Sequence, residues 1–189
     1  MKTVKVNHKR IRAEVIKEHL GEKRAFAFSC GNATRWLARA GVNLIAIDGL
    51  ELEAKHYIEP KKAEHYFNAF NATSGCLPTF LMERIADHIT KEINHNKPAE
   101  HGKIYAPFGS GELIVALGYL HPLHQIVAVT SNDFAPTFQD GTSPLTALVG
   151  KNCRILDVNG ARNVAALEEA ARQQATAADI FINTSEAEN

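Results

Sequence analysis

The 189-residue sequence predicts an α/β fold in which a mostly parallel sheet is flanked by helices. Short apolar segments with strand character alternate along the chain with amphipathic helical patterns, as they do where helices connect parallel strands. Hydrophobic residues make up 45% of the chain. A chain of this length and composition can bury a substantial core, so we expect a single compact unit, 1–189, formed as one domain or as two small lobes around a cleft.

The N-terminal half is predicted to alternate helices with strands. A charged helical pattern ends at Gly21 and a second one ends at Gly41, because glycine commonly terminates a helix. Pro78 suits the first turn of a longer amphipathic helix. Residues 49–76 are polar and are predicted to be irregular. The expected elements are helix 11–20, strand 25–28, helix 33–40, strand 42–47 and helix 78–94.

The C-terminal half continues the alternation after a polar linker, "NHNKPAEHG". The expected elements are strand 104–108, helix 112–120, strand 125–130, strand 154–158, helix 164–174 and strand 180–183. A smaller lobe is expected at about 25–100, and a larger one at about 101–189 together with the N-terminal helix.

Charge and cysteine usage restrict the functional classes. Lysine plus arginine equals aspartate plus glutamate at 21 each, so no overall field attracts nucleic acid or an anionic membrane. The three cysteines form no C-x-x-C pair, and the histidines show no ligand spacing, so no metal site is expected. No signal peptide is apparent, and no apolar run approaches the roughly 20 residues of a membrane span. We therefore expect a cytoplasmic protein that binds a small molecule.

Two predicted strand-to-helix turns carry candidate ligand-binding residues, since open parallel sheets bind ligands at the carboxyl ends of their strands. In "FSCGNATRWLA", Gly31 permits a tight backbone path and the Asn32 amide can donate and accept hydrogen bonds. Asn32 is equally well explained as the N-cap of the following helix.

The second turn, "PFGSGEL", places two glycines before a helix. Backbone N–H groups in such a turn can bind phosphate where glycine lets the ligand approach closely. The dinucleotide fingerprint fails because Ile114 stands where its last glycine is required, and no Lys-Ser or Lys-Thr pair completes a Walker loop. A generic phosphate turn remains, and so does a tight connection without a ligand.

Four segments together resemble the tryptophan synthase β-like, or fold type II, pyridoxal phosphate enzymes, in a shortened form. "NHKRIRAEVI" offers Lys9 at the start of a helix, and "FSCGNATRWLARAG" resembles the Ser-Gly-Asn turn of the family. "IYAPFGSGELIVALGYLHPLHQIVAVTSND" resembles its glycine-rich phosphate loop and the strand that follows. "DIFINTSEAEN" offers the hydroxyls of Thr184 and Ser185 near the end. The four segments occur in the family's order.

The resemblance implies pyridoxal 5'-phosphate as cofactor, with Lys9 forming a Schiff base to it and moving the α-proton of the substrate. It implies a lyase or β-replacement reaction on a small amino acid, and we further expect a homodimer. The implied cofactor-binding residues are Asn32 at the ring hydroxyl, Gly109, Ser110 and Gly111 at the phosphate, and Thr184 or Ser185 at the ring nitrogen. The implied substrate-binding residues are Ser29, Gly31 and Thr34.

Two residues depart from the family pattern. Cys30 separates Ser29 from Gly31 in the first turn, and Glu112 stands in the phosphate loop where the family prefers glycine. A carboxylate aimed at a phosphate repels it, so Glu112 is expected to face away. The alternatives are a non-catalytic α/β descendant that binds a ligand or partner, and an unrelated phosphate-binding domain with Lys9 as a solvated surface lysine.

Overall fold

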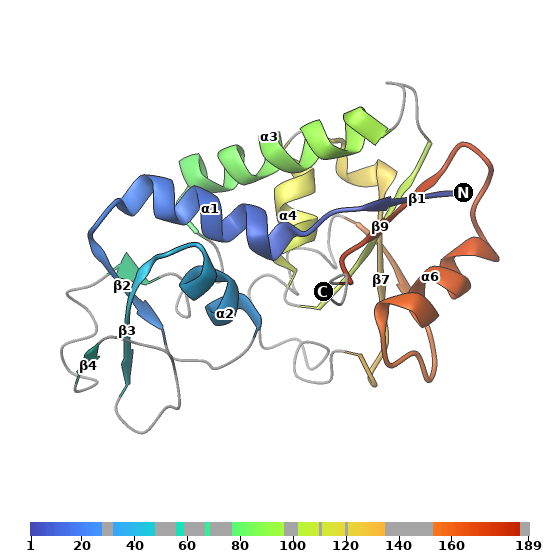
Figure 1. Ribbon diagram of the computed structural model, residues 1–189. Helices are drawn as coiled ribbons and strands as arrows, with labels where there is room; N and C mark the ends of the chain where they lie inside the picture. The colour runs from blue at the N-terminus through green and yellow to red at the C-terminus, as the bar shows by residue number, and fades with distance from the viewer. Residues whose placement is uncertain are drawn as a thin grey trace. The chain divides into compact units, whose positions relative to one another are not determined.

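The computed structural model describes residues 1–27, 32–47, 56–58, 67–68, 77–96, 102–109, 111–119, 121–134 and 153–185, as Figure 1 shows. Its contacts divide the chain into two compact units. Unit 1 contains Met1–Asn7 and Ala86–Asn189, and unit 2 contains His8–Ile85. Each unit has its own sheet, and the long helix α3 (Thr79–Asn96) begins in unit 2 and ends in unit 1.

Unit 1 is built on a five-stranded sheet in the order β1-β9-β6-β7-β8. The described pairings in this sheet are all parallel, with Tyr105 of β6 opposite Phe181 of β9 and Val127 of β7. The strands are β1 (Lys2–Lys5), β6 (Ile104–Pro107), β7 (Ile126–Thr130), β8 (Arg154–Asp157) and β9 (Ile180–Asn183). The predicted parallel sheet with flanking helices is confirmed.

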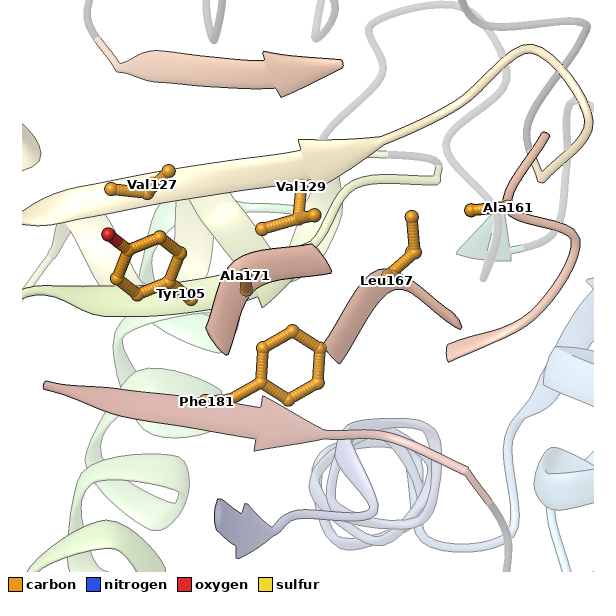
Figure 2. Packing of buried hydrophobic residues seen from close by; sticks show 7 residues of the cluster. All are labelled: Tyr105, Val127, Val129, Ala161, Leu167, Ala171 and Phe181. Atoms are coloured by element: carbon orange, nitrogen blue, oxygen red, sulfur yellow. The ribbon is translucent and has the colours of Figure 1, made fainter. Parts of the chain in front are cut away.

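One face of this sheet packs against helix α6 (Val164–Arg172). Figure 2 shows Ala171 of α6 between the rings of Tyr105 and Phe181, and Leu167 of α6 nearer to Val129 and Ala161. Val127, Val129 and Ala161 complete the buried cluster. Val127 and Val129 are alternate residues of β7, as expected when one face of a sheet is buried against a helix.

The opposite face is also buried along β6, β7 and β9. Helix α4 (Glu112–Gly118) contacts β6 and β7, and Figure 1 shows it across the sheet from α6. The strand residues that alternate with the α6-facing set have no exposed surface: Ile104, Ala106, Ile126, Ala128, Ile180 and Ile182. Burial on both faces explains why these strands are continuous apolar runs in the sequence. A short 3-10 helix, η2 (Leu123–Gln125), leads from α4 into β7.

Unit 2 contains a second sheet in the order β4-β3-β2-β5, again parallel throughout its described pairings. Its strands are β2 (Arg24–Ala27), β3 (Asn43–Ile47), β4 (His56–Ile58) and β5 (Phe67–Asn68). Helix α1 (His8–Leu20) packs on α2 (Asn32–Arg39). It also meets the first part of α3 through an ion pair between Glu18 and Arg84 and an edge contact between His19 and Phe80.

The sequence did not predict three of the strands. β1 has a single buried residue, Val4, between exposed polar ones, so its sequence looks like a charged terminus. β4 and β5 lie in the stretch 49–76 that was predicted to be irregular, and that prediction is wrong where these strands form. They have only three and two residues, so no period can be recognised in them.

Candidate functional site

The candidate site in unit 1 lies where β6 and β9 end, at the carboxyl edge of the sheet. β6 is followed by β7 on one side, yet its neighbour on the other side is β9, the last strand in the chain. Such a reversal of strand order is where open α/β sheets bind ligands. The β6–β9 pairing covers Ile104 and Tyr105, whereas β6 continues to Pro107, which has no N–H to donate. Phe108 then bonds to β7 through Val129 O at 2.7 Å.

The predicted phosphate turn follows β6 at this edge. Gly111 is the N-cap of α4, with a φ of 87°, a left-handed conformation that favours glycine. No side chain among the described residues caps this helix, and the Gly111 carbonyl accepts from Val115 N at 3.0 Å. Gly109 lies beside the Phe134 ring, and Ser110 lies outside the described residues. Glu112 occupies the first turn of α4 and is half-buried.

The predicted hydroxyl residues follow the neighbouring strand, β9. Thr184 is half-buried and Ser185 is exposed. Asn183, the last residue of β9, forms a turn with them: its Oδ1 accepts from Ser185 N at 2.8 Å and also from the Ser185 hydroxyl. Because β6 and β9 are neighbours and parallel, the glycine turn and the Thr184-Ser185 pair lie at the same edge of one sheet.

A polar network under this edge was not foreseen from the sequence. Glu168 of α6 accepts hydrogen bonds from Thr3 of β1, from Arg172 at 2.6 Å and from the Asn183 amide at 3.1 Å. Burial alone would raise the pKa of Glu168, but these bonds and the Arg172 charge lower it below its ordinary value. The carboxylate is therefore ionised at neutral pH and joins β1, α6 and β9. We call Thr3, Glu168, Arg172 and Asn183 the Glu168 network.

Lys9 follows β1 closely. Val6 N donates to Asn183 O at 3.0 Å, and the chain then passes through Asn7 and His8 to Lys9 in the first turn of α1. Lys9 is half-buried. Burial, with the charges of Lys9 and Arg12, lowers the pKa of His8 to about 3, so this ring is neutral at physiological pH.

Two arginines follow Lys9 on α1. Arg10 forms an ion pair with Glu14 at 3.1 Å on the exposed side of the helix, whereas Arg12 is buried.

The remaining predicted residues belong to the Ser-Gly-Asn-like turn in unit 2. Asn32 is the first residue of α2, and Thr34 is 2% exposed, with no hydrogen-bond partner for its Oγ1 in the described part of the chain. Ser29 and Gly31 lie outside the described residues. Unit 1 thus brings the glycine turn and the hydroxyl pair to one edge, while Lys9, Asn32 and Thr34 belong to unit 2.

Among the described residues, no group of three or more His, Cys, Asp or Glu side chains could hold a metal ion. No helix in the described part of the chain has the length and apolar character needed to span a membrane.

The protein is an α/β protein whose unit 1 sheet has the change of strand order at which such sheets commonly bind ligands. Several solved structures share its fold. A threonine deaminase from T.th. matches with 14% identity and a TM-score of 0.56, over 97% of this chain and 83% of that one. Maize serine racemase matches with 14% identity and a TM-score of 0.59, over 94% and 78%. Cysteine synthase from Entamoeba histolytica matches with 14% identity and a TM-score of 0.55, over 93% and 73%.

These three proteins are fold type II pyridoxal phosphate enzymes, so the predicted resemblance is confirmed at the level of the fold. The chain has the fold of that enzyme class. No protein-family model matches the sequence, and no curated protein matches it.

Two described features of unit 1 suit the chemistry of a phosphate-bearing ligand. The turn at Gly111 has a conformation that favours glycine. Thr184, a half-buried residue with a hydroxyl group, follows the adjacent strand. Lys9, the only predicted amine of the site, belongs to unit 2.

Proposed function

We propose that this protein is a pyridoxal 5'-phosphate-dependent lyase or β-replacement enzyme acting on a small amino acid. The observation that carries the proposal is the neighbouring position of β6 and β9, which puts the Gly109–Gly111 turn and the Thr184-Ser185 pair at one sheet edge. These two segments are far apart in the sequence. Their proposed roles, at the phosphate and at the ring nitrogen, are those that the resemblance implies for segments in this order.

Each proposed role is implied by the resemblance and suits the chemistry of the residue. Backbone N–H groups of the glycine turn bind phosphate, and the absence of a Cβ at Gly111 leaves room for close approach. Lys9 would supply the amine that holds the cofactor and would take up the α-proton of the substrate. The cofactor, when bound, would supply an electron sink. A neutral hydroxyl at the ring nitrogen would favour elimination and replacement over transamination, as the resemblance implies.

The resemblance also implies roles for the turn in unit 2, and we include them in the proposal. Asn32 would bind at the ring hydroxyl oxygen, and Ser29, Gly31 and Thr34 would bind the substrate. The Oγ1 of Thr34 is buried and has no partner among the described residues, so it suits such a contact.

A non-catalytic ligand-binding role is the second candidate, and Glu112 favours it. This carboxylate lies in the first turn of α4, immediately after Gly111. The N-terminus of a helix stabilises negative charge, and the Glu112 carboxylate supplies that charge in place of a phosphate. The catalytic role requires the Glu112 side chain to point away from the turn.

The decisive experiment is chemical labelling of the cofactor lysine. The purified protein is titrated with pyridoxal phosphate, reduced with borohydride and digested. We expect the label on the peptide containing Lys9, and none in the Lys9→Ala variant. Lys5→Ala, which alters an exposed lysine of β1, is the matched control and should keep the label. Label on a different lysine would reassign the catalytic residue, and no spectral change on adding cofactor would favour the non-catalytic role.

A second arm tests the phosphate turn. Gly111→Val should weaken pyridoxal phosphate binding by tenfold or more, on the order of 1.4 kcal/mol, because a side chain blocks the approach of the phosphate. Gly160→Val is the matched control: Gly160 also has a positive φ, 78°, with open space around its Cβ position. Both variants carry backbone strain, but only the first should lose affinity. Equal affinity in the two variants would exclude this turn from the site.

A further inference from the structure

The turn that follows β7 is held by one buried serine. Ser131, the residue directly after β7, is buried. Its hydroxyl donates to the backbone carbonyl of Ala161 and accepts from Phe134 N at 3.0 Å. The single hydrogen of the hydroxyl is therefore used at Ala161, while the oxygen holds the backbone of Phe134. We call residues 131–134 the β7 turn.

Further contacts within unit 1 restrain the same turn. Phe134 N also lies 3.2 Å from Ser131 O, and Val158 N donates to Thr130 O at 2.8 Å just before the turn. The Phe134 side chain is half-buried and packs against the core cluster under α6. The position of the Phe134 ring is therefore set by its backbone and by the core together.

The Phe134 ring borders the predicted phosphate turn. A Cβ placed on Gly109 would lie 3.7 Å from Phe134 Cε1, which is an ordinary van der Waals distance. The strand β7 itself also holds the start of this turn, because Phe108 N donates to Val129 O at 2.7 Å. The glycine turn after β6 is thus contacted twice from the same side, by the backbone of β7 and by the ring that follows β7.

We propose that Phe134 is a positioning residue for the Gly109–Gly111 turn, and that Ser131 is the anchor that keeps Phe134 beside Gly109. The inference rests on the proposed function, because it takes this turn as the phosphate site. Glycine has more backbone freedom than any other residue, so a turn with two glycines loses much entropy when a ligand orders it. A ring packed beside Gly109 restricts that freedom in advance and so favours binding.

The first test compares pyridoxal phosphate with pyridoxal, which lacks the phosphate. Phe134→Ala should weaken pyridoxal phosphate binding about threefold to tenfold and change pyridoxal binding by less than about twofold, because only the phosphate uses the turn. A general loss of structure would weaken both ligands alike, so the ratio of the two affinities isolates an effect on the turn. Tyr119→Ala, which removes an exposed ring at the C-cap of α4, is the matched control and should leave this ratio unchanged.

A smaller substitution keeps the test valid if Phe134→Ala does not fold. Phe134→Leu retains an apolar side chain against the core cluster but removes the ring beside Gly109. It should lower the same ratio in the same direction. An unchanged ratio in a folded Phe134 variant would overturn the positioning role of Phe134.

A double-mutant cycle tests the role of Ser131. Ser131→Ala removes the donor to Ala161 O, so it should lower the unfolding temperature whatever its effect on the ligand. If Ser131 acts through Phe134, it should also lower the ratio of the two affinities, and it should lower it no further in a Phe134→Ala background. A lower unfolding temperature with an unchanged ratio would overturn the anchoring role.

Inorganic phosphate separates this inference from the proposed function. Its binding is followed through the backbone amide resonances of Gly109 and Gly111, in the unmodified protein and in Phe134→Ala. Weaker phosphate binding in Phe134→Ala, in a protein that does not bind pyridoxal phosphate, would support the inference and overturn the proposed function alone. Pyridoxal phosphate binding that Phe134→Ala leaves unchanged would overturn the inference alone. Failure of the unmodified protein to bind either ligand would overturn both.

Discussion

Replacing Glu168 with glutamine should destabilise unit 1 measurably at neutral pH. Glu168 is half-buried on α6, with a side chain 14% exposed, and its carboxylate accepts from Thr3, Arg172 and Asn183. Glu168→Gln keeps the size of the side chain but removes the charge and turns one acceptor oxygen into a donor, which then opposes one of these three donors.

The size of the effect follows from those contacts. Hydrogen bonds to a charged group contribute about 1.5–3 kcal/mol each, and the glutamine oxygen retains part of that. The Arg172 side chain is 43% exposed, so its ion pair with Glu168 contributes to the free energy of unfolding about as little as a surface ion pair does. We expect a loss of about 2 kcal/mol, or about 4–8 °C in unfolding temperature for a chain of this size.

Urea unfolding of both proteins at several pH values provides the assay. The pKa of Glu168 in the folded protein lies below its ordinary value of 4.5, so its stabilisation is present above that pH. It is lost as pH falls through the folded pKa, and the difference between the two proteins should shrink there. Glu169→Gln, an exposed neighbour on the same helix, should cost less than about 0.5 kcal/mol. Equal losses in the two variants, or a difference independent of pH, would refute the reasoning.

Two further stability predictions concern the ends of elements in unit 1. Gly102→Ala should destabilise the protein by about 1–3 kcal/mol, because the added Cβ would overlap Asp179 Oδ1, which accepts a hydrogen bond from Lys103 N. Thermal unfolding measures this loss, and an unchanged midpoint would contradict the close packing. Asn163→Ala should cost about 1 kcal/mol because Asn163 caps α6 by accepting from Ala166 N at 2.9 Å. The exposed neighbour substitution Arg162→Ala serves as its control, and an equal effect on urea unfolding would exclude a capping role.

The sequence predicted most of the local structure correctly. Helices α1, α2, α3, α4 and α6 and the buried strands of unit 1 were predicted within a few residues of their bounds, because helix-ending glycines, a first-turn proline and continuous apolar runs are local signals. The glycine turn after β6 was recognised for the same reason: Gly111 adopts the positive φ that such a turn requires.

Weakly patterned strands could not be recognised from the sequence. β1 contributes only Val4 to the core, yet it forms a full parallel pairing with β9 from Lys2 to Lys5. That pairing carries the chain past Asn183 and into α1, where Lys9 lies. A strand of this kind forms because it pairs with a partner strand, here β9, that is distant in the sequence.

The residues of the candidate site were predicted from the sequence, and the tertiary structure decides which of the unit 1 segments share a sheet edge. Lys9, the glycines of the proposed phosphate turn and the Thr184-Ser185 pair were predicted from residue type and from the order of the four segments. That β6 and β9 are neighbours, and that Glu168 orients Asn183 at the end of β9, depends on contacts between distant segments. No local pattern encodes which parallel strands pair, because the choice depends on how the helices between them pack on the two faces of the sheet.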